Sequence, residues 1–343
     1  MKKKIRILIV DDSRTTRMIL KTILQIDPEI EVVGEAANGK EALEKTLELR
    51  PDLITMDLHM PDFDGVTGVR MIMDKCPTPI LVVTGAEEEG DTTIIFQALR
   101  AGALEVIDKP KRSKGERYRD LQHDLIQKVK TLSQINVENY GKGSQKFYIH
   151  SVDYFYKAVG IGASTGGPKT VAHILRDLPK NYPLPIFLVQ HITSQFTVGF
   201  AKWLDQEIQM EVEIPRQNDI PQGGKVYLAP PDQHMTIQNG QIHLNYGEPV
   251  HGCIPSVDVL FESLAKEYKD RVIGVLLTGM GEDGANGLKK IRDAHGYTIA
   301  QSEKTCIVYG MPKAAVERGG VMKIASPPEI TRELLLAVAE GDE

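Results

Sequence analysis

The sequence predicts two consecutive α/β domains: a doubly wound domain on a five-stranded parallel sheet, then a mostly parallel α/β domain with an antiparallel hairpin insertion. Short apolar strands alternate with helical patterns from the N-terminus, which is typical of a parallel sheet covered by helices. A similar alternation starts again after a polar stretch. The length of 343 residues corresponds to about two domains of roughly 150 residues each. We therefore expect domains at residues 1–125 and 156–343, joined by a linker at 126–155.

Composition excludes several classes of protein. The net charge of −6 argues against a broad nucleic-acid-binding surface. No unbroken apolar run approaches the roughly 20 residues of a membrane span, and the strand after the N-terminal lysines is too short for a signal peptide. We expect a cytoplasmic protein that binds no nucleic acid and does not insert into a membrane. Cys76, Cys253 and Cys306 lack any CxxC spacing, so neither a disulfide framework nor a structural zinc site is predicted.

Five apolar runs predict the strands of the first domain. They are residues 5–10, 32–33, 53–56, 80–83 and 106–107. Helical patterns separate them, for example through residues 18–24 and 42–47. Because functional groups in such sheets gather beyond the carboxyl ends of the strands, the residues that follow each run are the candidates for chemistry.

Polar residues follow these strands. Asp11 and Asp12 come after the first strand and Asp57 after the third, while Thr84 and Lys109 follow the fourth and fifth. Clustered carboxylates are tolerated where a cation is present or one of them is protonated, and oxygen ligands suit Mg²⁺. Taken singly, each aspartate is equally compatible with a solvated loop end. Together, the five residues predict a magnesium-dependent site where an aspartate forms an acyl phosphate.

This segment resembles the receiver domain of two-component response regulators. The motifs that carry the resemblance are Asp11-Asp12, Asp57 within Met56-Asp57-Leu58-His59-Met60-Pro61, Asp64-Gly65, Thr84 and Lys109-Pro110. The resemblance implies that Asp57 accepts phosphate and that Thr84 and Lys109 contact the phosphoryl oxygens. It also implies that Asp12, Asp57 and the backbone carbonyl of His59 ligate Mg²⁺, with Asp11 in the same acidic pocket.

Two positions depart from the usual receiver pattern, and His59 raises a separate question. Val106 stands where many receivers carry an aromatic side chain that rotates on activation, so we do not expect that switch here. Gly85 follows Thr84 and is expected to loosen that loop. His59 lies beside the phosphate acceptor, where it is either an exposed loop residue or an influence on the lifetime of the phosphoryl group.

The connecting segment has two parts. An apolar stripe with helical spacing, at Leu121, Leu125, Val129 and Leu132, is expected to close the sheet of the first domain. The polar stretch at residues 136–145 contains two glycines and is expected to be a flexible tether.

The second domain starts with an apolar strand at residues 158–161 and continues with strands at 186–189 and 272–277. Extended segments at 225–229, 235–237 and 241–244 lie between them, and Asn239-Gly240 is a typical hairpin turn. The C-terminal helical pattern through residues 334–338 is expected to pack on this domain.

A serine held between glycines ends the first of these strands. In the run Gly160-Ile161-Gly162-Ala163-Ser164-Thr165-Gly166-Gly167, a tight turn before a helix exposes Ser164 as a candidate nucleophile. The same run also fits a glycine-rich loop that holds phosphate at a helix N-terminus.

A serine nucleophile needs a general base and a group that orients it. His191 directly follows the strand at 186–189, and Asp283 lies in a glycine-rich turn after the strand at 272–277. Ser164, His191 and Asp283 are therefore expected to converge on one edge of the sheet. Their chain order differs from that of α/β-hydrolases, which disfavours that fold.

These residues resemble the catalytic domain of bacterial chemotaxis protein-glutamate methylesterases. The matching motifs are residues 162–167, Gln190-His191, Pro255-Ser256-Val257-Asp258, residues 278–284 and Tyr309-Gly310-Met311-Pro312. The resemblance implies hydrolysis of glutamate γ-methyl esters on chemoreceptors without a cofactor, deamidation of receptor glutamines, and a chemotaxis histidine kinase as phosphodonor. It further implies that Ser164 attacks, His191 moves the proton, Asp283 orients the imidazole, and backbone N–H groups near Thr165 and Met280 hold the oxyanion.

A receiver tethered to a hydrolase suggests control by occlusion, in which the unphosphorylated receiver covers Ser164 until Asp57 is phosphorylated. One rival interpretation is a receiver joined to a nucleotide-binding domain whose glycines after residue 160 hold phosphate. A DNA-binding response regulator is disfavoured, because the second half shows α/β alternation and no recognition helix.

Overall fold

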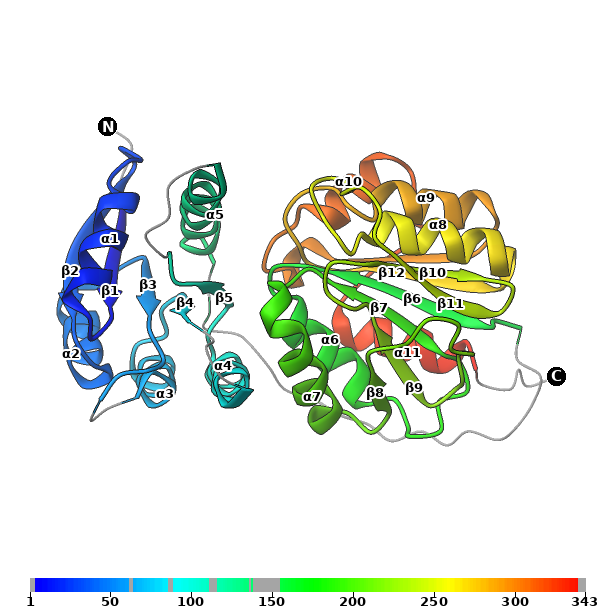
Figure 1. Cartoon of the computed structure of the whole chain (residues 1–343), viewed down its shortest axis with the longest axis horizontal. Helices are drawn as coiled ribbons and strands as arrows, with labels where there is room; N and C mark the ends of the chain where they lie inside the picture. Colours follow the sequence, from blue (N-terminus) through cyan, green and yellow to red (C-terminus); the bar gives the residue numbers. More distant parts are fainter. Residues whose placement is uncertain are drawn as a thin grey trace. The chain divides into compact units, whose positions relative to one another are not determined.

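The structure is a computed structural model that describes residues 4–61, 64–85, 89–110, 116–135, 137 and 155–338. The chain divides into two units, Met1–Lys142 and Gly143–Glu343, which we call the first and second units (Figure 1). Within the described residues, no helix is long and apolar enough to cross a membrane.

The first unit has a five-stranded sheet in the order β2-β1-β3-β4-β5, and every neighbouring pair is parallel. Its strands are β1 (Ile5–Val10), β2 (Ile30–Ala36), β3 (Leu53–Met56), β4 (Ile80–Thr84) and β5 (Glu105–Asp108). This confirms the predicted doubly wound sheet. It also brings the carboxyl ends of β1, β3, β4 and β5 to the same edge.

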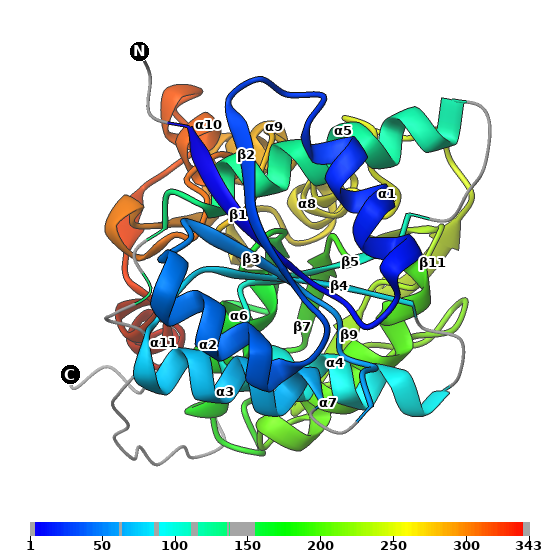
Figure 2. The ribbon, with the colours of Figure 1, turned by 90° about the vertical axis from the view of Figure 1, so that its left-hand side faces the viewer.

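In the described part of the first unit, helices cover this sheet on both faces. They are α1 (Arg14–Leu24), α2 (Gly39–Leu49), α3 (Gly65–Lys75), α4 (Glu89–Ala101) and α5 (Glu116–Leu132). Helices α1 and α5 contact each other on one face, and α2, α3 and α4 form a row on the other (Figure 2).

The apolar stripe before the tether belongs to α5. Leu125, Val129 and Leu132 are buried in the first unit, which confirms that the stripe closes its sheet. The domain boundary expected at residue 125 therefore falls inside a helix, because the buried positions continue to Leu132. Most of the tether expected at residues 136–145 lies outside the described residues, which leave out 136 and 138–154.

The second unit has a seven-stranded sheet in the order β14-β13-β12-β6-β7-β9-β8, again parallel throughout. Its strands are β6 (Ala158–Ala163), β7 (Ile186–Gln190), β8 (Glu211–Glu213), β9 (Lys225–Leu228), β12 (Val272–Leu276), β13 (Tyr297–Gln301) and β14 (Lys323–Ala325). The antiparallel pair β10 (His234–Gln238) and β11 (Gln241–Asn245) stands apart and confirms the predicted hairpin.

Helices cover both faces of this sheet too. The α-helices are α6 (Gly167–Arg176), α7 (Thr197–Glu207), α8 (Val257–Tyr268), α9 (Ala285–Asp293), α10 (Met311–Glu317) and α11 (Pro327–Leu336), and the short 3₁₀ helices are η1 (Ser194–Phe196), η2 (Lys269–Arg271) and η3 (Glu303–Thr305). Figure 1 shows α8, α9 and α10 on one face and α6, α7 and α11 on the other. The hydroxyl of Thr331 in α11 donates to the carbonyl of Ile174 in α6 at 3.0 Å, so the C-terminal helix packs on this unit as expected.

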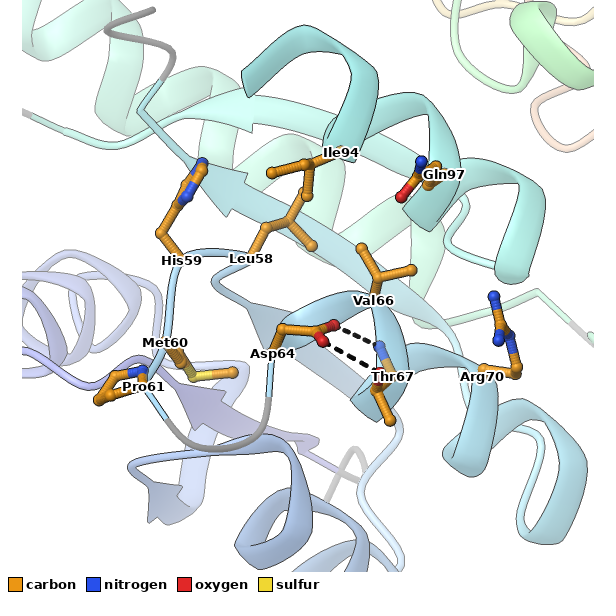
Figure 3. Close-up of a pocket in the computed structure, with 10 residues that line it drawn as sticks. All are labelled: Leu58, His59, Met60, Pro61, Asp64, Val66, Thr67, Arg70, Ile94 and Gln97. Atoms are coloured by element: carbon orange, nitrogen blue, oxygen red, sulfur yellow. Dashed lines mark hydrogen bonds between the residues drawn. The ribbon is translucent and has the colours of Figure 1, made fainter. Parts of the chain in front are cut away.

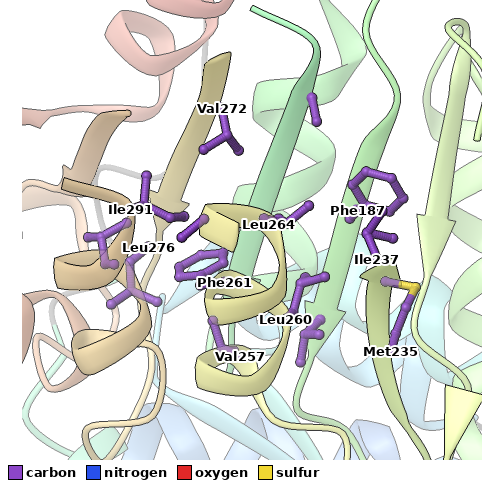
Figure 4. Packing of buried hydrophobic residues seen from close by; sticks show 14 of the residues in the cluster. Phe187, Met235, Ile237, Val257, Leu260, Phe261, Leu264, Val272, Leu276 and Ile291 are labelled. Atoms are coloured by element: carbon purple, nitrogen blue, oxygen red, sulfur yellow. The ribbon is translucent and has the colours of Figure 1, made fainter. Parts of the chain in front are cut away.

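Helix α8 lies close over the centre of the second sheet. Its buried Phe261 and Leu264 pack with residues of β12 and α9 (Figure 4). Gly162 in β6 permits this approach, since a Cβ there would lie only 2.2 Å from a methyl group of Val257. The packing fixes the N-terminus of α8 beside the carboxyl ends of β6 and β12.

Candidate active site and phosphorylation site

The first unit brings its acidic residues together at the edge where β1 and β3 end. Asp11, Asp12 and Asp57 each place a carboxylate oxygen within 4.8 Å of the other two. Asp11 and Asp57 are buried, whereas Asp12 is exposed. Two buried carboxylates so close together need a positive charge beside them.

Lys109 and Thr84 both contact Asp57. The ammonium of Lys109 donates to Asp57 Oδ2 at 2.7 Å and lies 2.9 Å from Asp11 Oδ2. The hydroxyl of Thr84 donates to Asp57 Oδ1 at 3.2 Å. The two residues expected to contact phosphoryl oxygens thus surround the carboxylate expected to accept the phosphate.

Burial and charge shape the titration of this cluster. Burial raises the pKa of Asp11, and repulsion from Asp57 adds to the rise, although the Lys109 ammonium opposes both. Burial alone would lower the pKa of Lys109, but its ion pair with Asp11 and its hydrogen bond to Asp57 outweigh burial and raise that pKa. Lys109 is therefore a permanent cation at neutral pH.

The acidic cluster also fits a hard divalent cation. Asp11 Oδ2 is buried and, among the described residues, accepts no hydrogen bond, even though Lys109 lies close to it. A buried carboxylate oxygen that accepts no hydrogen bond is a suitable ligand for Mg²⁺, which prefers oxygen donors.

The side chain of His59 belongs to a neighbouring surface pocket. This pocket has a volume of about 600 Å³ and lies between the loop after β3 and helices α3 and α4 (Figure 3). Among its lining residues, Asp64 caps α3 by accepting hydrogen bonds from the backbone N–H and the hydroxyl of Thr67, at 2.7 and 3.1 Å. His59 is exposed at this pocket. Its influence on the lifetime of the phosphoryl group stays a prediction.

In the second unit, Ser164 follows β6 and precedes α6. Its backbone N–H donates to the carbonyl of Thr278 at 3.0 Å, and its carbonyl accepts from the side-chain amide of Gln190 at 2.9 Å. These bonds tie Ser164 to the ends of the strands on either side. Ser164 is half-buried, and no hydrogen bond of its hydroxyl is seen within the described part of the chain.

The backbone of Gly279 lies close to Ser164 and leaves no room for a side chain between them. A Cβ on Gly279 would lie 2.7 Å from the Cβ of Ser164 and 2.2 Å from the sulfur of Met311. Only glycine fits at this position without moving the serine.

His191 and Asp283 form a direct pair beside Ser164. The register of β6 and β7 pairs Ala163 with Gln190, so the next residues on the two strands are Ser164 and His191. His191 Nε2 lies 2.9 Å from Asp283 Oδ2, and the two side chains are 15% and 3% exposed. The three residues expected to converge thus lie at adjacent strand ends, although among the described contacts no hydrogen bond joins Ser164 to His191.

Asp283 lies at the N-terminus of α8, which supplies most of its hydrogen bonds. The Ser256 hydroxyl and the Asp258 N–H donate to Oδ1 at 2.7 and 3.0 Å, and the Val257 N–H donates to Oδ2 at 2.7 Å. The Gly284 N–H adds a bond to Oδ1 at 3.0 Å. Because helix N-termini favour negative charge, this position keeps Asp283 ionised.

The contact between His191 and Asp283 shifts the pKa of both side chains. Burial alone would lower the pKa of His191, but hydrogen bonds with Asp283 and Cys253 outweigh it and raise that pKa to about 9. Burial would raise the pKa of Asp283, yet the His191 bond and the donors at α8 keep it below its usual value. The carboxylate therefore stabilises a positive charge on the imidazole.

Thr165 and Met280 flank the serine on two loops. Thr165 is buried, and its carbonyl accepts a hydrogen bond from the Thr278 hydroxyl at 2.9 Å. Met280 is half-buried in the loop after Gly279. Their expected part in holding an oxyanion stays a prediction.

Sequence reasoning missed two neighbours of the pair. It quoted Ser256 only as part of a motif, although a serine directly before an apolar helical run is a recognisable N-cap. The sequence assigned no partner to Cys253, but Cys253 Sγ lies 3.8 Å from His191 Nδ1. No sequence signal indicates that contact, which joins residues 62 positions apart.

Comparison with known proteins now identifies the family. The model of the CheB methylesterase family matches residues 159–334, and that of the response regulator receiver domain matches residues 7–116. The chain belongs to the CheB methylesterase family. This confirms both resemblances noted from the sequence.

Relatives of the CheB family match over nearly the whole length. One, from Syntrophus aciditrophicus, is named protein-glutamate methylesterase/protein-glutamine glutaminase 1, is 40% identical, and aligns over 96% of this chain and 97% of its own. A relative of the same enzyme name from Thermotoga maritima is 38% identical over 92% of this chain and 93% of its own. The crystal structure of the Thermotoga maritima CheB methylesterase catalytic domain is 37% identical, with a TM-score of 0.52, and covers 53% of this chain and 99% of that domain.

Proposed function

We propose that this protein is a cytoplasmic, phosphorylation-regulated protein-glutamate methylesterase. It hydrolyses glutamate γ-methyl esters on chemoreceptors, releases methanol, and deamidates receptor glutamines. Membership of the CheB family and the names of its relatives support this activity. The observation that carries the proposal is the His191–Asp283 pair at the strand end next to Ser164.

In the first half of the reaction, the Ser164 hydroxyl attacks the ester carbonyl carbon. Its proton passes to His191 at Nδ1, because Nε2 is bonded to Asp283. The protonated imidazole then returns the proton to the departing methoxide, which leaves as methanol. The glutamyl group stays on Ser164 as an ester, and the negative charge of the tetrahedral intermediate lies near the Thr165 and Met280 backbone N–H groups.

In the second half, water replaces the alcohol. His191 accepts a proton from that water, the resulting hydroxide attacks the glutamyl ester, and the proton returns to the Ser164 oxygen. Glutamate and free serine result. A glutamine side chain follows the same steps with ammonia as the leaving group.

The receiver supplies the control. Asp57 accepts a phosphoryl group from a chemotaxis histidine kinase, while Lys109 and Thr84 are close enough to reach its oxygens after they release the free carboxylate. Asp12, Asp57 and the His59 carbonyl, with Asp11 beside them, would hold Mg²⁺. When bound, that ion neutralises charge on the phosphoryl oxygens.

The unphosphorylated receiver covers Ser164 in this proposal, and phosphorylation releases it. Deleting residues 1–145 should then raise methanol release above that of the intact, unphosphorylated protein. The crystal structure of an isolated relative domain supports the use of this fragment. Activity of the fragment that is no higher than that of the intact protein would exclude occlusion.

Mass spectrometry of receptor peptides tests the chemistry at residue level. Methylated chemoreceptor membranes are incubated with the protein, Mg²⁺ and acetyl phosphate, and the conversion of methyl esters and glutamines to glutamates is followed. Ser164→Ala should convert neither, whereas Ser133→Ala, whose hydroxyl donates to the Lys130 carbonyl in the last turn of α5, should match the wild type. Nucleotide binding together with unchanged conversion by Ser164→Ala would favour the phosphate-cradle interpretation instead.

A further inference from the structure

The thiol of Cys253 lies beside the catalytic imidazole and close to Asp283, with one ligand atom of each of the three residues within 4.8 Å of the other two. Its sulfur lies 3.8 Å from His191 Nδ1, while Asp283 is bonded to Nε2. Cys253 lies in the loop between β11 and α8 and is half-buried, and its thiol also donates to the His251 carbonyl at 3.7 Å. The serine hydrolase chemistry described above does not use this thiol.

The separation of sulfur and nitrogen matches that of two ligands on one zinc ion. Zn–S and Zn–N bonds of about 2.3 and 2.1 Å at a tetrahedral angle place the two atoms about 3.6 Å apart. Thiolate and imidazole are also the ligand types that zinc prefers over the oxygen ligands of Mg²⁺. Small side-chain movements would bring both atoms into bonding range.

The contact between Asp283 and His191 is of a kind that is common in zinc sites. A histidine ligand in such sites commonly donates its other ring N–H to a carboxylate, which fixes the ring and raises its basicity. The 2.9 Å contact of Asp283 with Nε2 already has this form. The carboxylate is itself held by Ser256 and the N–H groups of α8, so the ring is oriented before any ion arrives.

We propose that His191 Nδ1 and Cys253 Sγ form a binding site for a soft divalent cation such as Zn²⁺, and that the bound ion inhibits the enzyme. On binding, the thiol releases its proton to water and the sulfur and ring nitrogen each donate an electron pair to the ion. The two remaining tetrahedral positions are open to water or to the Ser164 oxygen.

The ion inhibits the enzyme because it binds the ring nitrogen that serves as the base. Nδ1 is the atom that receives the proton from Ser164, so a ligated ring cannot act as the base. This consequence rests on the proposed function, whereas the binding of the ion does not.

A neighbouring cluster offers an alternative site and therefore a control. His251, Asp258 and Asp283 place ligand atoms within 4.8 Å of one another. This cluster has no sulfur, and Asp258 already accepts the Gly287 N–H at 2.6 Å. A soft cation should prefer the site that contains Cys253.

The test is a titration of the full-length protein with Zn²⁺ by calorimetry and with Co²⁺ by absorption, in excess Mg²⁺ to occupy the receiver carboxylates. Cobalt bound to a thiolate gives a near-ultraviolet charge-transfer band, which reports the sulfur ligand directly. We compare the wild type with Cys253→Ser, with His251→Gln, and with Cys306→Ser, the other half-buried thiol of the second unit.

The wild type should bind one soft cation with the thiolate band. Cys253→Ser should lose the band and at least about tenfold in affinity, since even the loss of an outer partner of a zinc ligand costs that much. His251→Gln and Cys306→Ser should keep both. Wild-type affinity and band in Cys253→Ser, or their loss in Cys306→Ser, would overturn the site.

Methanol release with and without Zn²⁺ then tests inhibition, with each variant compared with its own metal-free rate. Zinc should suppress release by the wild type and have at least about tenfold less effect on Cys253→Ser at the same concentration. Binding without suppression would refute the inhibitory role. No release by the metal-free wild type would instead contradict the proposed function and leave the binding result intact.

Discussion

The Ser256 hydroxyl donates a 2.7 Å hydrogen bond to Asp283 and so connects the first turn of α8 to the carboxylate that orients His191. The same oxygen accepts the Val259 N–H at 3.4 Å as the N-cap of the helix. One serine thus caps a helix and positions the carboxylate that contacts His191. Ser256 can make both hydrogen bonds because α8 packs over β6, which places the start of the helix beside Asp283.

Ser256→Ala should lower kcat/KM for methanol release by roughly 10- to 100-fold, because a hydrogen bond to a charged group contributes about 1.5–3 kcal/mol. Loss of the cap should also reduce the free energy of unfolding by about 1 kcal/mol. Ser326→Ala, which removes the N-cap of α11, is the matched control. It should lose similar stability and keep its activity; equal losses of activity in both variants would refute a positioning role for Ser256.

The raised pKa of His191 predicts an alkaline rise in activity. The general base must be neutral, and its pKa lies near 9 instead of 6.5, so kcat/KM should increase as pH rises from 7 toward 9. The contribution of the charged His191–Asp283 pair to folding stability has the opposite pH dependence. It is fully present below the pKa of His191 in the unfolded chain, and it is lost as pH rises through about 9. A pH–rate profile that is flat above pH 7 would contradict this assignment.

Gly279→Ala should damage activity more than stability. The new Cβ would lie 2.7 Å from the Cβ of Ser164, so the nucleophile must move, and a shift of about 1 Å can cost on the order of 100-fold in rate. Gly240→Ala in the β10–β11 turn has open space around its Cβ and a φ of 72°, so its cost is backbone strain alone. Kinetics and thermal unfolding of both variants separate the two effects.

Lys109→Met should make the first unit depend on magnesium for stability. Removal of one partner of a buried ion pair costs about 3–5 kcal/mol, and here Asp11 and Asp57 would both lose their cation. Added Mg²⁺ should therefore raise Tm more in this variant than in the wild type. Lys130→Met removes a surface cation that pairs with Asp27 and Glu29, and its unfolding should respond to Mg²⁺ as the wild type does.

The placement of several site residues at the carboxyl ends of strands was predictable from the sequence. In a parallel sheet, residues directly after strands meet at one edge, so Asp57, Lys109, Ser164 and His191 could be placed by counting strand ends. The apolar runs that mark β1, β3, β6 and β7 are buried almost throughout, which makes such strands easy to recognise.

Other features depend on tertiary packing and carry little local signal. Strands β8 and β14 have three residues each with exposed positions, and they extend edges of the sheet that the sequence did not indicate. β13 is a buried strand that sequence analysis did not assign. The contacts of Asp283 with Ser256 and of His191 with Cys253 arise only when α8 and the loop before it settle on the sheet.

Methanol release from methylated chemoreceptor membranes tests the central claim most directly. The protein and Ser164→Ala are compared with Mg²⁺, in the presence and absence of acetyl phosphate. We predict release by the wild type that increases with acetyl phosphate, and none by Ser164→Ala under either condition. Equal release by both proteins, or none by the wild type once phosphorylation of Asp57 is verified, would contradict the account.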